Sequence, residues 1–264
     1  METSLETIFI LAGGLVGFII GLTGVGGGSL MTPILVLGFG ITPSIAVGTD
    51  LLYAAITKAN GVFFHHRNKT IDWKVAGLMA AGSIPSSILS VFFIENIRAR
   101  GFDYDSIMMT TLSFMLVTTA LIIIIKNRLL AWVHSKKSGA IALMLSYRPY
   151  LTVLSGVVLG FLVTISSVGA GAIGSAILFM LYPSKKPTSI VGTDLAHAIP
   201  LTAIAGAGHL HLGTVDFNLL LGLLTGGIPA IYLGSILGKK LPDTLLSPII
   251  ALILFLMGIK LAFY

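Results

Sequence analysis

Residues 45–51 read Ile-Ala-Val-Gly-Thr-Asp-Leu, and residues 190–195 read Ile-Val-Gly-Thr-Asp-Leu. Each copy follows a proline by a few residues and lies near the start of a long apolar run. A carboxylate inside a lipid-length apolar segment is expensive to bury and is therefore usually functional. The repeated aspartates, Asp50 and Asp194, thus mark candidate functional positions in a duplicated pattern.

The composition is that of a polytopic membrane protein. Of the 264 residues, 55% are hydrophobic and 10% are charged, and the mean hydropathy is +1.00, whereas soluble domains carry about 25% charged residues. The lysines and arginines form short clusters between apolar runs, which indicates membrane topology and not nucleic-acid binding. The absence of cysteine excludes disulfides and cysteine-ligated metals. Glu2 and Glu6, with no basic residue before the first apolar run, predict a retained segment and not a cleaved signal peptide.

The apolar runs predict an all-α architecture. A spanning helix needs about 20 apolar residues. Two long stretches, residues 5–40 and 150–183, are each interrupted by small residues, at 21–29 and 166–172. Six uninterrupted spans are predicted at residues 44–64, 74–94, 104–125, 188–208, 217–238 and 245–263.

The interruptions belong to an internal repeat. Matches between the halves recur at a nearly constant offset of about 144 residues, which indicates duplication. One transmembrane domain, residues 1–264, is expected to contain repeat one (1–125), a cytoplasmic linker (126–149) and repeat two (150–264). Each repeat comprises one broken segment and three transmembrane helices.

The basic residues decide whether the broken segments cross the membrane or fold back. If they cross, the basic residues divide nine against six, which is hardly a bias. If they fold back, only Arg98, Arg100 and Lys260 face one side, while Lys58 lies within a span. The others then share the cytoplasmic side: Arg67, Lys69, Lys74, Lys126, Arg128, Lys136, Lys137, Arg148, Lys185, Lys186, Lys239 and Lys240.

Fold-back segments leave three net crossings per half, so the second repeat is inverted relative to the first. Both termini are then outside the cell membrane. Inverted repeats with broken helices are a transporter architecture, in which the substrate binds near the midplane.

The two interruptions are candidate anion sites. No Gly-Lys-Ser/Thr follows the glycines, so they are not a phosphate-binding Walker loop. One interpretation is close helix packing through small residues. The other is that free N–H groups and the helix dipole bind an anion. The candidate residues are Gly26, Gly27, Gly28 and Ser29 in the first half and Ser167, Gly169, Ala170 and Gly171 in the second.

The aspartates have two interpretations as well. Each could be a structural acceptor that braces the break, or a carboxyl that binds a proton during transport. His197 follows Asp194 by three residues and is expected to share its helix face, whereas Tyr53 takes that place in half one. Lys58 lies two turns after Asp50.

The polar asymmetry between the halves suits a substrate with unlike ends, and drift explains it almost as well. A carboxylate repels an anion unless it is protonated or screened, so the neighbouring Thr49 and Thr193 and the cation of Lys58 are the better substrate donors. The histidine pairs at 65–66 and 209/211 fall on opposite sides of the membrane, so no metal site or cofactor is expected.

The sequence resembles the TauE/SafE family of sulfite and sulfonate exporters over essentially its whole length. The resemblance is carried by Gly-Leu-Thr-Gly-Val-Gly-Gly-Gly at 21–28 with Pro33, by Ala-Val-Gly-Thr-Asp at 46–50, and by residues 60–65. It implies a cell-membrane permease that exports sulfur-containing anions such as sulfite, sulfoacetate or taurine-derived products. The second break, residues 169–171, departs from an all-glycine pattern, so the second half-site is expected to hold substrate less closely.

The leading hypothesis is a secondary transporter, not an enzyme, that moves a small sulfur-containing anion between inverted repeats, with Asp50 and Asp194 either proton-linked or structural. A passive anion channel of the same architecture is the first alternative. An intramembrane enzyme that uses Asp194, His197 and a nearby serine is the second. The expected partners are the anion and the lipid bilayer, and a chain this small is expected to form a homodimer.

Overall fold

The computed structural model describes residues 2–23, 28–135, 146–238 and 243–263. These residues are nearly all helical and include no strand, which confirms the all-α prediction. The helices are α1 (Glu2–Thr23), α2 (Gly28–Phe39), α3 (Pro43–Arg67), α4 (Trp73–Ala99), α5 (Tyr104–Ser135), α7 (Arg148–Ser166), α8 (Ala172–Leu181), α9 (Pro187–His211), α10 (Phe217–Gly238) and α11 (Asp243–Ala262).

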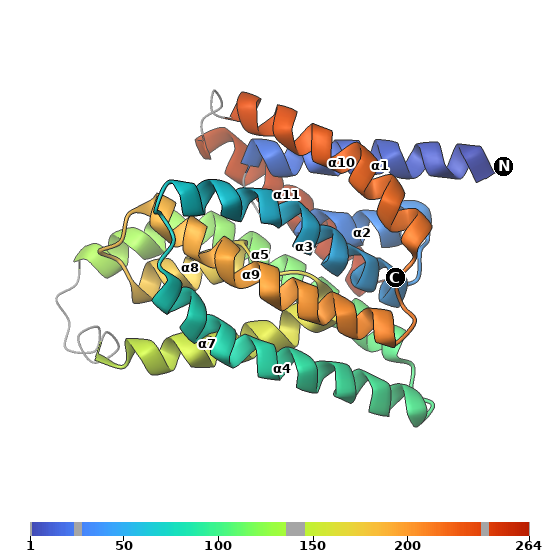
Figure 1. The fold of residues 1–264 in the computed structure, drawn as a ribbon, viewed down its shortest axis with the longest axis horizontal. Coiled ribbons are helices and arrows are strands. Elements are labelled where there is room, and N and C mark those ends of the chain that lie inside the picture. The colour runs from blue at the N-terminus through green and yellow to red at the C-terminus, as the bar shows by residue number, and fades with distance from the viewer. Residues whose placement is uncertain (1, 24–27, 136–145, 239–242, 264) are drawn as a thin grey trace.

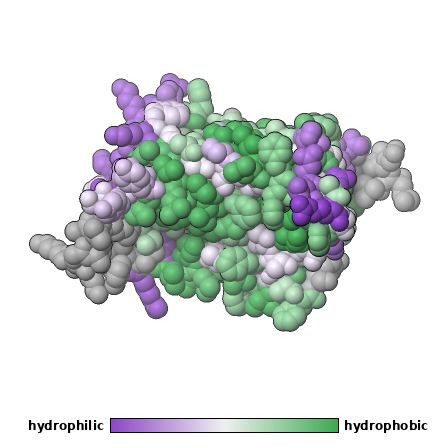
Figure 2. All heavy atoms as spheres, turned by 90° about the horizontal axis from the view of Figure 1, so that it is seen from below, coloured by the Kyte–Doolittle hydropathy of each residue, from purple (hydrophilic) through white to green (hydrophobic). Residues whose placement is uncertain are grey.

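The helices suit a membrane. Figure 2 shows a broad hydrophobic belt across one face of the molecule, with hydrophilic residues gathered at the two ends. Of the shorter apolar helices, Thr7–Leu22, Ser29–Phe39 and Ala172–Leu181 lie in the two interrupted stretches, whereas Leu246–Ala262 lies in the predicted span 245–263. In the described ranges, five segments are long and apolar enough to cross a bilayer: Trp73–Ala99, Tyr104–Lys126, Arg148–Ser166, Pro187–His211 and Phe217–Leu237. The protein is therefore membrane-embedded and multi-pass.

Each interrupted stretch forms a long helix followed by a short one that returns along it. The ring of Phe9, near the start of α1, lies 6.1 Å from the ring of Phe39 at the end of α2. The hydroxyls of Thr152, near the start of α7, and Tyr182, just after α8, are 2.9 Å apart. The N- and C-terminal ends accordingly lie on one side in Figure 1, while α5 ends and α7 begins on the other.

Helices of one half pack against helices of the other. The main pairs are α1 with α10, α4 with α7, α5 with α11 and α3 with α9. A Cβ on Gly13 of α1 would collide with the backbone of Leu223 in α10, and one on Gly156 of α7 would collide with Met79 in α4. These glycines therefore allow close backbone approach, as the packing interpretation of small residues requires.

The start of α3 contacts the residues that follow α9, and the start of α9 contacts the residues that follow α3. The N–H of Asp216, after α9, donates to Thr49 Oγ1 near the start of α3, at 3.1 Å. The N–H of Asp72, after α3, donates to Thr193 Oγ1 near the start of α9, at 2.9 Å. The two helices therefore run antiparallel. Inverted repeats would produce this exchange, and the inverted repeat itself stays a prediction.

The boundary between the repeats differs in detail from the expected one. Helix α5 continues to Ser135 and α7 begins at Arg148, so part of the expected linker, residues 126–149, is helical. Residues 136–145 lie outside the described residues. The cytoplasmic position of the linker and the outer position of the termini stay predictions.

Candidate functional site

A cluster of ionisable side chains is buried where α3 meets α9. The exposed fraction is 0% for Asp50, 2% for Asp194, 8% for Lys58 and 1% for His197. Helix α3 supplies Asp50 and Lys58, and α9 supplies Asp194 and His197. Because charged groups in a bilayer interior are rare and usually functional, this cluster is the candidate site.

Asp50 is held by a hydroxyl of its own half and approached by a hydroxyl of the other half. Thr32 Oγ1, in α2, donates to Asp50 Oδ2 at 2.6 Å. Ser167, from the break between α7 and α8, approaches the same carboxylate without meeting hydrogen-bond geometry. Oδ1 of Asp50 has no hydrogen-bond partner in the described structure. The first turns of α2 thus brace this carboxylate and leave one oxygen open.

Asp194 occupies a related position in the second half. Its carboxylate packs directly against Gly174 in the first turn of α8, where any Cβ would collide with Oδ1. The backbone N–H of Ser175 and the ammonium of Lys58 lie near this carboxylate. Oδ1 of Asp194 also lacks a hydrogen-bond partner within the described ranges. Only a glycine at position 174 lets the carboxylate lie this close to α8.

Lys58 reaches from the first half into the break of the second. Its Nζ donates to the backbone carbonyl of Ala170 at 3.2 Å. The ammonium also interacts electrostatically with the carboxylates of Asp194 and Asp50. This buried ammonium therefore binds a backbone carbonyl of the second half and lies within electrostatic range of two carboxylates.

The break between α7 and α8 is a short unwound segment. Ser167 ends α7 in the left-handed conformation, with φ of 57°, and its N–H donates to Val163 O at 2.7 Å. Gly169 and Gly171 have φ of 114° and 127°, values that L side chains rarely adopt. Over the described chain, the N–H groups of Ala170, Gly171 and Ala172 donate to no protein acceptor. The break thus presents free donors at the start of α8.

The first half-site is described only in part. Gly26 and Gly27 lie outside the described residues. Gly28 begins α2, and Ser29 follows it and is buried. The predicted match between the two half-sites therefore stays a prediction.

His197 and Tyr53 occupy matching positions and have different partners. His197 Nε2 lies 2.8 Å from Ser83 Oγ of α4, and its Nδ1 has no partner in the part of the chain described. The buried Tyr53 hydroxyl packs against Gly227 of α10 and has no hydrogen-bond partner there either. His197 is thus bound to α4 of the other half, although its spacing in the sequence predicts a place on the same helix face as Asp194.

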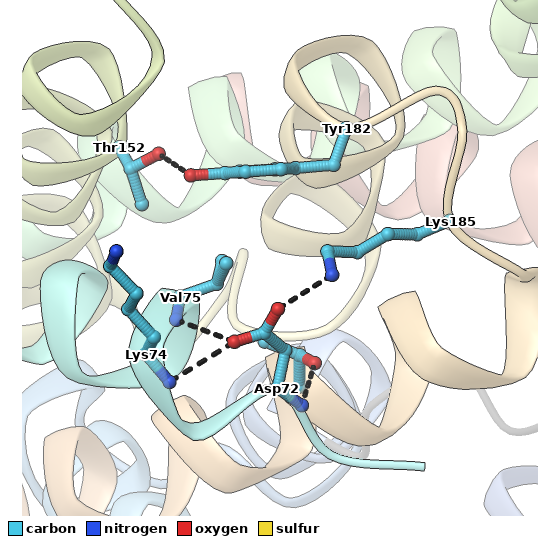
Figure 3. Close-up of polar contacts among 7 residues, drawn as sticks. Asp72, Lys74, Val75, Thr152, Tyr182 and Lys185 are labelled. Atoms are coloured by element: carbon cyan, nitrogen blue, oxygen red, sulfur yellow. Dashed lines mark hydrogen bonds and ion pairs between the residues drawn. The ribbon is translucent and has the colours of Figure 1, made fainter.

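The two threonines of the repeated stretch lie at two contacts between the halves, which we call seams. The first seam joins Thr49 to Asp216, and the second joins Thr193 to Asp72. Thr49 and Thr193 accept the backbone bonds described above, so each hydroxyl is engaged at the start of α10 or α4. At the second seam, Asp72 also forms an ion pair with Lys185 from the loop before α9 (Figure 3). The geometry therefore gives these threonines a packing contact and leaves their role as substrate donors a prediction.

Thr32 and Ser83 were not anticipated as site residues. Thr32 lies one helical turn after Gly28 in the sequence, and its hydroxyl donates to Asp50. Ser83 is one of several buried serines in α4. Its contact with His197 joins residues 114 positions apart, and no local pattern predicts such a contact.

Comparison with known proteins places this geometry in a family. The model of the family described as "Sulfite exporter TauE/SafE" matches residues 9–261. A "Probable membrane transporter protein YjnA" of Bacillus subtilis (strain 168) is 40% identical over 252 residues, covering 96% of this chain and 98% of that protein.

More distant relatives carry the same kind of description. "Probable membrane transporter protein YdhB" of the same organism is 30% identical over 97% of this chain and the whole of that protein. "Probable membrane transporter protein MJ0441" of Methanocaldococcus jannaschii is 29% identical over 96% of this chain and 93% of that protein. No solved structure matches the chain. The chain belongs to the TauE/SafE family of membrane transporters.

Proposed function

We propose that the protein is a secondary transporter that exports a small sulfur-containing anion, such as sulfite or an organosulfonate, through a site between its two halves. The observation that carries the proposal is the break at the start of α8. There, free N–H groups of residues 170–172 lie next to the unpartnered hydroxyl of Ser167, which is 4% exposed, and close to Lys58. Oriented N–H groups at a helix N-terminus attract anions.

The donors suit an oxyanion. A sulfite or sulfonate head has three oxygens that accept hydrogen bonds in different directions, so several converging donors hold it better than one charged clamp. In the proposal, Ser167 and residues 169–171 hold the anion from one half. Residues 26–29 hold it from the other half, and Thr49, Thr193 and Lys58 add donors.

The exchanged contacts support a transport mechanism between inverted halves. The short helices α2 and α8 each turn back from an interruption, and α3 and α9 cross in opposite directions. In transporters built this way, one half moves relative to the other around a fixed midplane site. The charge of the basic residues supports a cytoplasmic linker and outer termini.

Charge balance assigns different roles to the two aspartates. An ionised carboxylate beside the anion must be protonated or screened. Lys58 binds the carbonyl of Ala170 just before α8, and Asp194 packs against Gly174 in the first turn of α8, so we assign Asp194 as the counterion of Lys58. Asp50 has a hydroxyl donor on one oxygen and an open second oxygen, which is where a proton would bind when the anion enters.

The family description and the relatives' names support the substrate class and the transport activity. The matching family is described as a sulfite exporter, and the relatives are named as membrane transporters. The geometry by itself supports an anion and does not distinguish sulfur from other oxyanions.

Transport assays in proteoliposomes test the proposal. Sulfite, sulfate, sulfoacetate and taurine are offered separately, with and without a pH gradient. We expect saturable movement of sulfite or a sulfonate that responds to the gradient. High flux that ignores the gradient would identify a passive channel, and no movement of any of the four solutes would refute the proposal.

A further inference from the structure

The carbonyl of Ala170 lies in the unwound segment between α7 and α8 and receives its hydrogen bond from a side chain of the other half. Lys58 Nζ donates this bond at 3.2 Å, and Lys58 is only 8% exposed. The carboxylates that interact with the ammonium are Asp194 of α9 and Asp50 of α3. The ammonium is therefore hydrogen-bonded to a backbone carbonyl of the second half, and two carboxylates lie within electrostatic range of it beyond ion-pair distance.

Oxygen ligands of these two kinds commonly bind metal cations. In secondary transporters with interrupted helices, unwound backbone carbonyls coordinate the coupling Na⁺. Carbonyl and carboxylate oxygens are the ligands that hard cations prefer. Here a covalently attached ammonium takes the position that such a cation would need.

We propose that Lys58 is a built-in cation at the second break, which replaces a coupling sodium ion and makes transport independent of Na⁺. This inference rests on the proposed transport function and adds the identity of the cation at the same site. The ammonium holds the break of the second half against α3 of the first, and it balances the charge of Asp194 without an ion from solution.

The surroundings of Lys58 support a fixed cation. The other titratable groups near it are the imidazole of His197 on α9 and, beside Asp50, the phenol of Tyr53. Neither adds a further negative charge to those of the two carboxylates at neutral pH. At the position of α9 that corresponds to Lys58 stands Thr202, whose hydroxyl donates to Ala198 O of its own helix at 2.9 Å. The built-in cation is thus a feature of one half and not of the repeat.

Removing the ammonium should leave a gap lined by oxygens. In a Lys58→Ser variant, the Ala170 carbonyl and the Asp194 carboxylate lose their cation, while the serine hydroxyl adds one more oxygen. Loss of one charge-assisted hydrogen bond predicts about tenfold lower transport in choline buffer. Sodium ions should restore part of the transport and raise the melting temperature of the purified variant.

The experiment compares wild type, Lys58→Ser and Lys58→Arg in sodium, potassium and choline chloride at equal ionic strength. Lys260→Ser is the control, because Lys260 is exposed near the end of α11. Sulfite transport and thermal unfolding of the detergent-solubilised protein are measured in parallel. We expect the transport rate and the melting temperature of wild type, of Lys58→Arg and of the control each to stay the same from one salt to the next, and only Lys58→Ser to respond to sodium.

The outcomes separate this inference from the transport proposal. Sodium-dependent transport by wild type or by Lys58→Arg would overturn the inference, and so would a folded Lys58→Ser variant that ignores sodium in both assays. If Lys58→Ser does not fold, the inference is judged from whether transport by wild type and by Lys58→Arg depends on sodium. Should no protein move sulfite, the unfolding assay still reports on the cation site while the transport proposal fails.

Discussion

Lys185 forms an ion pair with Asp72, and this pair joins the loop before α9 to the start of α4 (Figure 3). Asp72 also caps α4 by accepting bonds from the N–H groups of Lys74 and Val75. In the other half, Asp216 caps α10 in the same way, but Ile41 stands where a matching lysine would be. The two seams between the halves are therefore fastened differently.

We expect Lys185→Gln to loosen the seam at Asp72. The pair is partly exposed, so the loss of stability should be small, about 0.2–1 kcal/mol. The larger effect should be faster labelling of a cysteine introduced at Thr193, in a chain that otherwise contains none. Lys186→Gln is the matched control because its exposed side chain makes no capping bond. Equal labelling rates in both variants would contradict a fastening role.

The ion pair between Lys185 and Asp72 predicts how the stability of the fold depends on pH. Burial raises the pKa of Asp72, but the hydrogen bond and charge of Lys185 and the two N–H donors outweigh it and lower the pKa below its ordinary value of 3.8. A carboxyl with a lowered folded-state pKa stabilises the fold above its ordinary pKa and loses that contribution as the pH falls through the folded-state value. The stability difference between wild type and Lys185→Gln should therefore be constant from neutral pH to about pH 4 and vanish only in stronger acid. Thermal unfolding at a series of pH values measures it, and a difference that disappears near neutral pH would refute the assignment.

Replacing Thr32 should weaken the brace on Asp50. Thr32→Val removes a hydroxyl donor to a buried carboxylate and should cost about 1.5–3 kcal/mol of stability. Thr110→Val is the control, because the Thr110 hydroxyl is exposed and bonds only to Ser106 O of its own helix, at 2.9 Å. Thermal unfolding in detergent compares the two variants. If they unfold at the same temperature, Thr32 is not a brace.

Asp50→Asn separates proton binding from bracing. If Asp50 carries the coupled proton, the variant should exchange sulfite across proteoliposomes while losing its response to a pH gradient. An asparagine keeps an oxygen acceptor for Thr32, so the brace is retained. A response to the gradient that survives unchanged would make Asp50 structural.

A methyl group at position 174 should displace Asp194. Gly174→Ala places a Cβ against the Asp194 carboxylate, and overpacking of this kind costs about 1–3 kcal/mol. Gly77→Ala, in α4, is the control because a Cβ there meets nothing within 4 Å. We expect the first variant to lose stability and transport and the second to retain both. Normal transport by Gly174→Ala would show that transport does not require the Asp194 carboxylate to lie against α8.

The sidedness of the linker is open to a labelling experiment. The distribution of basic residues predicts that residue 137 is cytoplasmic and that Arg100 is outside. In intact cells, an impermeant thiol reagent should label a cysteine at position 100 and not one at 137. Labelling of position 137 from outside would contradict the fold-back topology.

The sequence by itself determined the class of the protein and the plan of its helices. Apolar length, the prolines that begin α3 and α9 and the small-residue interruptions are local signals, so the helix ranges and the two breaks could be read from them. The repeated aspartates were recognisable for the same reason, since a carboxylate in an apolar segment stands out wherever it lies.

Only the tertiary structure decided which side chains meet. Lys58 donates to Ala170, 112 residues away, and His197 contacts Ser83 instead of Asp194 one turn before it. Thr49 and Thr193, adjacent to the aspartates in sequence, point to the seams because successive helical residues face different directions. Such contacts depend on how the two halves pack against each other, and helical periodicity within one segment carries no information about the partner across the interface.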